Sequence, residues 1–205
     1  MLPRQFCKGT ELNKKILAGV NLLADYTAAT LGPRGRNVNL KTESGNPMIT
    51  KDGVTVANHV DLEDPFENVG AQIIKQVSAQ TNTSAGDGTT TATVLARAIL
   101  NQSQRYLVAG MSPIELQRGI NLAVDGIVTN LQDMAQPIRS KDDIAHIATI
   151  SANNDRNLGN IVATAVDSVG KDGAVTVEEA RSLETSLDLI EGFRFASGYT
   201  ATAFI

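Results

Sequence analysis

Apolar side chains recur along most of this chain at helical spacing, three and four residues apart. Leu12, Ile16 and Leu23 share one face of a first predicted helix. A second helix leads up to a glycine-rich loop, and a third follows it. The segment Ser112-Pro113-Ile114-Glu115, a capping box with proline at the first helical position, starts a fourth. We expect the four helices to pack as one bundle. The apolar faces of the second, third and fourth helices are, in that order, Phe66, Val69, Ile73 and Val77; Val94, Leu95, Ala98 and Ile99; and Leu116, Ile120, Ala123, Ile127 and Leu131.

Short strands are predicted between the first and second helices. Residues 36–40 and 48–50 form a predicted hairpin across the polar segment 43–47. After the turn Lys51-Asp52-Gly53, we expect Val54 and Val56 to continue as extended chain.

A smaller unit is predicted after Gln136-Pro137, where proline breaks the fourth helix. Ser140 is placed to cap a short helix, and a second apolar stripe ends at Gly170. Residues 174–177 and 187–190 alternate between apolar and polar positions, which predicts paired strands. The stripe that ends at Gly170 consists of Leu158, Ile161, Val162, Ala165, Val166 and Val169.

Composition narrows the function classes. The 205 residues are 42% hydrophobic, which is enough for a sizeable core. The net charge of −4 and the lack of a basic run interleaved with aromatic residues argue against nucleic acid as a partner. No apolar run approaches the roughly 20 residues of a membrane span, so no membrane partner is expected. Cys7, the single cysteine, cannot form an internal disulfide, which fits a reducing compartment.

The glycine-rich loop carries the most informative chemistry. Residues 85–93 read Ala-Gly-Asp-Gly-Thr-Thr-Thr-Ala-Thr, so two glycines flank one carboxylate at the start of a long helix. Unpaired backbone N–H groups and the positive end of the helix dipole favour phosphate there. Asp87 is then placed to hold Mg²⁺, which prefers a few carboxylates together with phosphate and water. The alternative interpretation is a tight turn whose polar residues cap the next helix.

Other motifs give weaker signals. Lys-Asp-Gly occurs twice, at residues 51–53 and 171–173, and each copy first predicts a turn that feeds a strand. Nothing suited to phosphate accompanies the second copy, for which we prefer the turn alone. No Gly-x-x-x-x-Gly-Lys-Ser/Thr sequence is present, so any ATP would bind by another route than a P-loop. His59 and His146 lack partners at ligand spacing and are interpreted as structural.

Residues 30–35, 51–53 and 85–93 together resemble the nucleotide-binding motifs of the group I chaperonins, the Hsp60 and GroEL-type family, in wording and in order. The resemblance continues through residues 63–71, 149–153 and 190–192 and covers nearly the whole chain. It implies an α+β multidomain fold. In that fold, residues 1–136 belong to a mainly α-helical equatorial ATP-binding domain with a β-hairpin. Residues 137–192 belong to a small α/β intermediate domain, and residues 193–205 to the start of an apical domain. The resemblance places hinges at Pro137 and Gly192.

The family also implies a site and its cofactors. Asp52 is the carboxylate expected to position the attacking water in catalysis, and Asp87 the one expected to bind Mg²⁺. Lys51 is expected to contribute a positive charge that interacts with the phosphates of ATP or ADP, and K⁺ is a further candidate ion. The residues expected to contact the nucleotide are Thr30, Leu31, Gly32, Pro33, Lys51, Asp87, Gly88, Thr89, Thr90 and Thr91. In the family a second aspartate far along the chain shares the task of Asp52, and this sequence does not contain it.

The resemblance implies an ATP-hydrolysing chaperonin subunit that forms homo-oligomeric rings and assists the folding of non-native polypeptides. Unfolded client proteins and a co-chaperonin are the expected partners. We expect a cytoplasmic location, with the mitochondrial matrix or a host cytoplasm as alternatives. A non-catalytic interaction or scaffold module is the competing hypothesis. A small ATP-dependent phosphotransferase is a third, for which the sequence offers no acceptor site.

The sequence departs from the family pattern in two places. Arg34 stands where lysine is common, and residues 195–202 differ from the usual apical wording. Much of the expected apical domain, and the returning halves of the other two domains, have no counterpart in these residues. We therefore expect either the N-terminal part of a longer protein or a short form that works differently.

Overall fold

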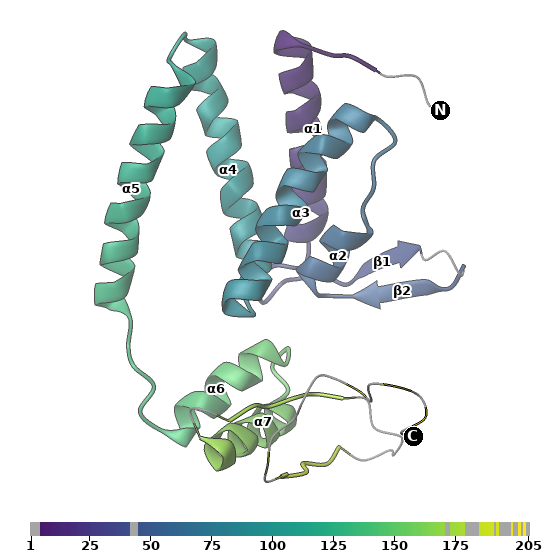
Figure 1. Cartoon of the computed structure of the whole chain (residues 1–205), viewed down its shortest axis with the longest axis vertical. Helices are drawn as coiled ribbons and strands as arrows, with labels where there is room; N and C mark the ends of the chain where they lie inside the picture. The colour runs from purple at the N-terminus through teal and green to yellow at the C-terminus, as the bar shows by residue number, and fades with distance from the viewer. Residues whose placement is uncertain are drawn as a thin grey trace. The chain divides into compact units, whose positions relative to one another are not determined.

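The computed structural model describes residues 5–41, 45–170, 173–178 and 185–190, with the single residues 192, 198, 201 and 203. The chain divides between Asp133 and Met134 into two compact units. The helices and strands in chain order (Figure 1) are α1 (Gly9–Ala28), β1 (Val38–Lys41), β2 (Pro47–Thr50), α2 (Gly53–His59), α3 (Pro65–Ala85), α4 (Thr89–Val108), α5 (Pro113–Met134), α6 (Lys141–Ser151) and α7 (Arg156–Val169).

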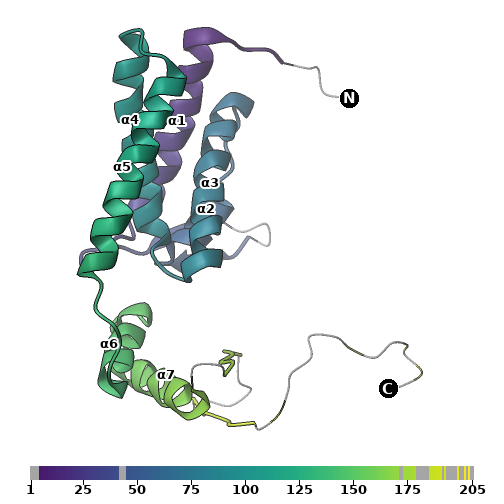
Figure 2. The same ribbon diagram turned by 60° about the vertical axis from the view of Figure 1, so that its left-hand side comes forward.

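The core of the first unit lies between α1, α2 and α3, and α4 packs against it (Figure 2). Leu23 of α1 and Ile74 of α3 are fully buried there. Burying a side chain of this size stabilises the fold by about 1.5 to 3 kcal/mol. The core cluster consists of Val20, Leu23, Ala57, Ala71 and Ile74, with Ala96 and Leu100 of α4 packed against it.

The crossing of α1 and α3 requires two glycines. A Cβ atom added at Gly19 would lie 1.8 Å from the carbonyl oxygen of Glu67, and one added at Gly70 would lie 2.0 Å from that of Ile16. The two backbones are therefore in direct contact at this crossing, which leaves no room for a side chain at either glycine.

An ion pair also ties α1 to the start of α3. The Asp64 carboxylate caps α3 by accepting the backbone N–H groups of Phe66 and Glu67 at 2.8 and 3.2 Å. Lys15 Nζ lies 2.5 Å from Asp64 Oδ2 and 5.4 Å from the centre of the Phe66 ring. The hydrogen bond from Lys15, followed by those from the two backbone N–H groups, lowers the pKa of Asp64. The same side-chain hydrogen bond raises the pKa of Lys15.

The predicted core faces of α3 and α4 are wrong by about one residue. On α3, Val69 is 48% exposed and Ile73 37% exposed, whereas Gly70, Ala71, Ile74 and Ser78 are buried. On α4, Leu95 and Ile99 are exposed, and the buried positions are Thr89 and Thr93. On α3 the close crossing with α1 favours the face that carries the small residues Gly70 and Ala71, which give little apolar signal in the sequence.

The predicted fourth member of the bundle does not join it. α5 begins at Pro113 as expected, but none of its residues is buried. Leu116 and Ile120 are half-buried, and Ala123, Ile127 and Leu131 are exposed. In Figure 1 α5 diverges from α4 beyond the loop that joins them. Within the part of the chain that the structure describes, the bundle therefore consists of α1, α3 and α4, with α2 against them.

The hairpin is confirmed. β1 and β2 pair antiparallel, with Asn39 opposite Ile49 and Leu40 opposite Met48. The predicted turn includes residues 43 and 44, which lie outside the described residues.

The extended chain predicted at Val54 and Val56 is wrong, because both belong to the short helix α2. The Asp52 side chain caps α2 by accepting the backbone N–H groups of Val54 and Thr55. Val56 and Ala57 are fully buried. The cap and this burial together outweigh the strand preference of β-branched residues.

The second unit contains two of the predicted helices. Ser140 caps α6 in a capping box with Asp143, and α7 ends at Val169 with Gly170 as its C-cap. Hydrogen bonds from the Arg139 backbone and from Ser140 lower the pKa of Asp143. Ala163 and Ala165 of α7 are buried.

The paired strands predicted after α7 are absent from the described residues 173–178 and 185–190. Val177 is 89% exposed and Ile190 86% exposed. A two-stranded ribbon with such exposed side chains has no packing to hold it. Lys171 and Asp172, and nearly all of residues 193–205, lie outside the described residues, so the intermediate and apical assignments stay predictions. No helix in the described ranges combines the length and apolarity needed to cross a membrane.

Candidate nucleotide-binding site

Three segments that are far apart in the sequence meet at the N-terminal end of α4. The Thr30 and Thr90 hydroxyl oxygens lie 3.4 Å apart. A Cβ atom added at Gly53 would lie 2.1 Å from Thr90 Oγ1 and 3.1 Å from Thr27 Cγ2. We call Thr30, Gly53 and Thr90 the threonine junction. It brings together the segments that contain the predicted residues 30–33, 51–52 and 87–91.

The first wall of the site is the loop that follows α1. The Thr30 backbone N–H and hydroxyl both donate to the carbonyl oxygen of Thr27, at 3.1 and 2.8 Å. The Leu31 N–H donates to the carbonyl of Ala28 at 3.0 Å. These bonds hold the loop against the end of the helix. Leu31, Gly32 and Pro33 are exposed, so their backbone is accessible to a ligand.

The second wall is the loop between α3 and α4. Gly86 and Gly88 have φ values of 71° and 81°, a left-handed conformation that strongly favours glycine. Asp87 stands between them, exposed, and its Oδ1 accepts the Gly88 backbone N–H at 2.6 Å. Two left-handed residues thus turn the chain sharply and leave the Asp87 carboxylate at the start of α4.

α4 begins without a side-chain cap. The N–H groups of its first turn, from Thr89 to Thr91, point out of the helix, where they and the helix dipole favour an anion. The side chains of these residues differ in accessibility: Thr89 is buried, Thr90 half-buried and Thr91 exposed. Thr89 can therefore offer a ligand its backbone N–H, whereas Thr91 can offer its hydroxyl as well.

Lys51 and Asp52 lead from the hairpin into α2. The Lys51 side chain is exposed and forms no ion pair within the described ranges. The Asp52 carboxylate is held at the start of α2, because Oδ2 accepts both the backbone N–H and the hydroxyl of Thr55, at 3.0 and 2.5 Å. Among the described residues, Lys51 therefore offers an ammonium group without an ion-pair partner, and Asp52 offers a carboxylate whose direction is fixed by Thr55.

The donor set fits Mg²⁺ bound together with phosphate. The described residues contain no group of three or more His, Cys, Asp or Glu side chains that could hold a metal ion by themselves. Mg²⁺ typically binds through one or two carboxylates plus substrate phosphates and water. Asp87, next to a helix N-terminus suited to phosphate, meets that requirement.

The sequence model of the TCP-1/cpn60 chaperonin family matches residues 23–204 of this chain. The chain belongs to the TCP-1/cpn60 chaperonin family. Membership confirms the resemblance to the Hsp60 and GroEL-type chaperonins and supports a chaperonin role. Every predicted site residue lies within the matched span.

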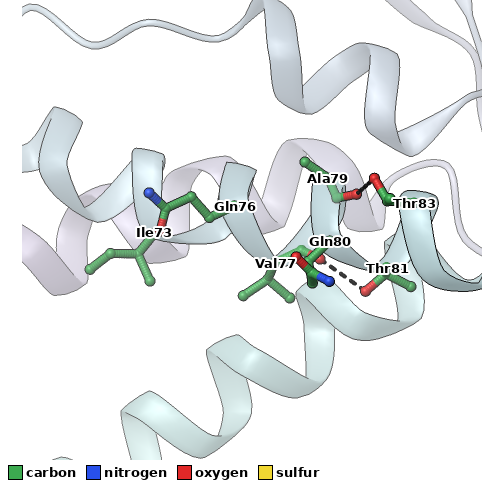
Figure 3. Close-up of a pocket in the computed structure, with 7 residues that line it drawn as sticks. All are labelled: Ile73, Gln76, Val77, Ala79, Gln80, Thr81 and Thr83. Carbon is green, nitrogen blue, oxygen red and sulfur yellow. Dashed lines mark hydrogen bonds between the residues drawn. The ribbon is translucent and has the colours of Figure 1, made fainter.

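A separate hollow of about 700 Å³ lies on α3 of this chaperonin chain (Figure 3). Ile73, Val77 and Gln80 are among its lining residues, all of which come from this one helix. The Thr81 and Thr83 hydroxyls donate to the carbonyls of Val77 and Ala79 in the same helix. The hollow contains none of the predicted site residues and presents few free polar groups, so we do not assign the nucleotide to it.

Sequence reasoning did not single out Thr55 or Thr50, which hold Asp52 in place. The Asp52 backbone N–H donates to the Thr50 hydroxyl at 3.0 Å. The sequence does contain a pattern typical of a helix cap, because Thr55 follows Asp52 by three residues. The predicted strand at residues 54–56 is incompatible with that cap. His59, interpreted as structural, has Nδ1 2.9 Å from the Thr55 carbonyl oxygen.

Proposed function

We propose that this chaperonin chain binds ATP with Mg²⁺ at the threonine junction and hydrolyses it as a subunit of a homo-oligomeric ring that assists the folding of non-native polypeptides. The observation that carries the proposal is the meeting of Thr30, Gly53 and Thr90, which joins three nucleotide-motif segments at one helix N-terminus. Helix N-termini bind phosphate through free N–H groups and the helix dipole.

Each residue of the site then has a role that phosphoryl transfer requires. One wall of the nucleotide site is formed by Thr30, Leu31, Gly32 and Pro33. The phosphates are surrounded by Gly88, Thr89, Thr90 and Thr91. Asp87 would hold Mg²⁺, which neutralises phosphate charge, and Lys51 would add a second cation. Asp52 would orient the attacking water. Catalysis of this kind depends on positioning and on charge neutralisation.

Phosphate release from ATP by the purified chain, measured with and without Mg²⁺, tests this assignment. Asp87→Asn should lower the Mg²⁺-dependent rate by on the order of a hundredfold, because the metal loses its carboxylate ligand next to the developing charge. Asp133→Asn, at an exposed position near the end of α5, is the matched control and should leave the rate unchanged. An undiminished rate in Asp87→Asn would refute the metal assignment.

Ring assembly and client binding need their own measurement. Native mass spectrometry with and without Mg·ATP would report the size of the assembly and any co-chaperonin that binds it. We expect a closed homo-oligomer, because a heterologous interface between identical subunits generates a ring when the rotation between neighbours closes, and an open filament when it does not. Suppressed aggregation of an unfolded client would support the folding role.

A non-catalytic interaction or scaffold module is the alternative. The observation that favours it is the exposed apolar side chains of α5, where Leu122 is 76% exposed and Met134 75% exposed. Apolar surface on this scale promotes association with other proteins. Stable association of the purified chain without any phosphate release would favour the scaffold role over the ATPase.

A further inference from the structure

The two oxygens of the Asp52 carboxylate have different surroundings. Oδ2 accepts two hydrogen bonds from Thr55, one from the hydroxyl at 2.5 Å and one from the backbone N–H at 3.0 Å. Oδ1 accepts only a long bond of 3.4 Å, from the Val54 N–H, among the described residues. Oδ2 is therefore firmly held, whereas Oδ1 can accept a hydrogen bond from a further donor.

We propose that Thr55 is a positioning residue for Asp52, holding Oδ2 so that Oδ1 faces the water that attacks ATP. This inference rests on the proposed function, because it assigns a role within the same hydrolytic site. It adds a residue outside the nucleotide contacts and names the carboxylate oxygen that accepts the hydrogen bond from water.

Capping of α2 does not by itself require the Thr55 hydroxyl. The backbone N–H groups of Val54 and Thr55 already make the usual N-cap bonds with Asp52. The hydroxyl adds a second bond to the same oxygen, and its length is in the range of charge-assisted O–H···O⁻ bonds. Thr55 is also β-branched and half-buried, so its side chain has little rotational freedom. The contact thus fixes the direction of the carboxylate more tightly than capping alone.

Asp52 is anchored from its backbone as well. Its N–H donates to the Thr50 hydroxyl at 3.0 Å. Thr50 thus fixes the main chain of Asp52 while Thr55 fixes its carboxylate. The Asp52 carboxylate is exposed, so a water molecule can reach Oδ1 without rearrangement of the fold.

The test compares Thr55→Val and Thr55→Ser in steady-state ATP hydrolysis by the full chain. Valine keeps the shape and loses the donor, whereas serine keeps the donor. Because misplaced catalytic groups cost up to about a hundredfold, Thr55→Val should lower kcat by about tenfold or more. KM for ATP should stay within about twofold, since no nucleotide contact is lost. Thr55→Ser should recover most of kcat.

Thr129→Val in α5 is the matched control, because it also removes a helical threonine hydroxyl, one that donates to the Asp125 carbonyl. It should leave both constants unchanged. A Thr55→Val enzyme with unchanged kcat would overturn the inference, as would a parallel loss in Thr55→Val and Thr55→Ser.

Asp52→Ala separates this inference from the proposed function. If Asp52→Ala abolishes hydrolysis while Thr55→Val does not, the ATPase assignment stands and the positioning role is refuted. If the parent chain does not hydrolyse ATP, the proposed function fails and the role of Thr55 fails with it. If Asp52→Ala is fully active, hydrolysis does not depend on Asp52, and the positioning role of Thr55 is refuted while ATP hydrolysis itself stands.

Discussion

The hydroxyl oxygens of Thr30 and Thr90 lie 3.4 Å apart, although 60 residues separate them in the sequence. Thr30 follows α1, and Thr90 is in the first turn of α4. Gly53, at the start of α2, lies against the same Thr90 side chain. The contact therefore joins three helices at the place where the family motifs converge. A substitution in one of the three segments should alter the packing of the other two.

Gly53→Ala should destabilise the first unit through Thr90. The new Cβ would lie 2.1 Å from Thr90 Oγ1, and overpacking of this kind costs about 1 to 3 kcal/mol. Adding Thr90→Ala should recover part of the loss, because the nearest remaining atoms would be Thr27 Cγ2 at 3.1 Å and Thr90 Cβ at 3.3 Å. Urea unfolding of both variants and of Thr90→Ala alone measures this coupling.

Gly119→Ala is the matched control for this cycle. Nothing lies within 4 Å of a Cβ added at Gly119 in α5. Alanine should therefore stabilise the helix there by about 0.5 to 1 kcal/mol. Strictly additive effects of Gly53→Ala and Thr90→Ala would contradict the contact between them.

Two neighbouring isoleucines on α3 test which face of the helix is buried. Ile74 is fully buried and Ile73 is 37% exposed. Ile74→Ala should lower the free energy of unfolding by about 2 to 5 kcal/mol. Ile73→Ala should change it far less, by about 0.5 to 1 kcal/mol. Equal losses in chemical denaturation, or a larger loss at Ile73, would place the core on the other face.

The ion pair between Lys15 and Asp64 should make stability depend on acid pH. The pKa of Asp64 is lowered in the folded state, chiefly by the Lys15 hydrogen bond and then by the backbone N–H groups of Phe66 and Glu67. Its contribution is thus fully present above the ordinary aspartate pKa of about 3.9 and is lost as the pH falls through the lower, folded value.

Thermal midpoints measured from pH 6 downwards should therefore fall less steeply in Asp64→Asn than in the parent chain. Lys15→Met keeps the backbone bonds to Asp64 and should give an intermediate slope. Asp143, whose pKa is also lowered, should leave a residual acid dependence in both variants. Identical pH profiles for the parent chain and Asp64→Asn would contradict the assigned cause.

The parts of the fold that depend on local chemistry could be predicted from the sequence. Proline at the first position of α5, Ser140 as the cap of α6 and Gly170 after α7 are signals that act within one turn of a helix. The hairpin could be predicted for the same reason. Each depends on the preferences of a few neighbouring residues.

The failures have tertiary causes. The buried face of α3 differs from the predicted one because Gly70, which permits the close crossing with α1, and the neighbouring Ala71 carry less apolar signal than Val69 and Ile73. α2 differs from the predicted extended chain because Val54 and Val56 favour a strand in isolation, whereas the Asp52 cap and the burial of Val56 stabilise a helix.

The candidate site shows the same division. Gly86, Asp87 and Gly88 could be recognised from their order alone, because the turn and the helix start are local. The contact between Thr30 and Thr90 depends on how α1 and α4 pack, which no short motif encodes. The family resemblance indicated that these segments belong together, and the hydroxyl contact gives the physical reason.

Hydrogen exchange with and without Mg·ATP tests the central claim most directly, because it monitors the three segments at once. If the nucleotide binds at the threonine junction, backbone exchange should slow together at residues 30–33, 51–53 and 87–91, and α5 should be unaffected. Protection at only one of these segments, or along the α3 hollow instead, would contradict a shared nucleotide site at the start of α4.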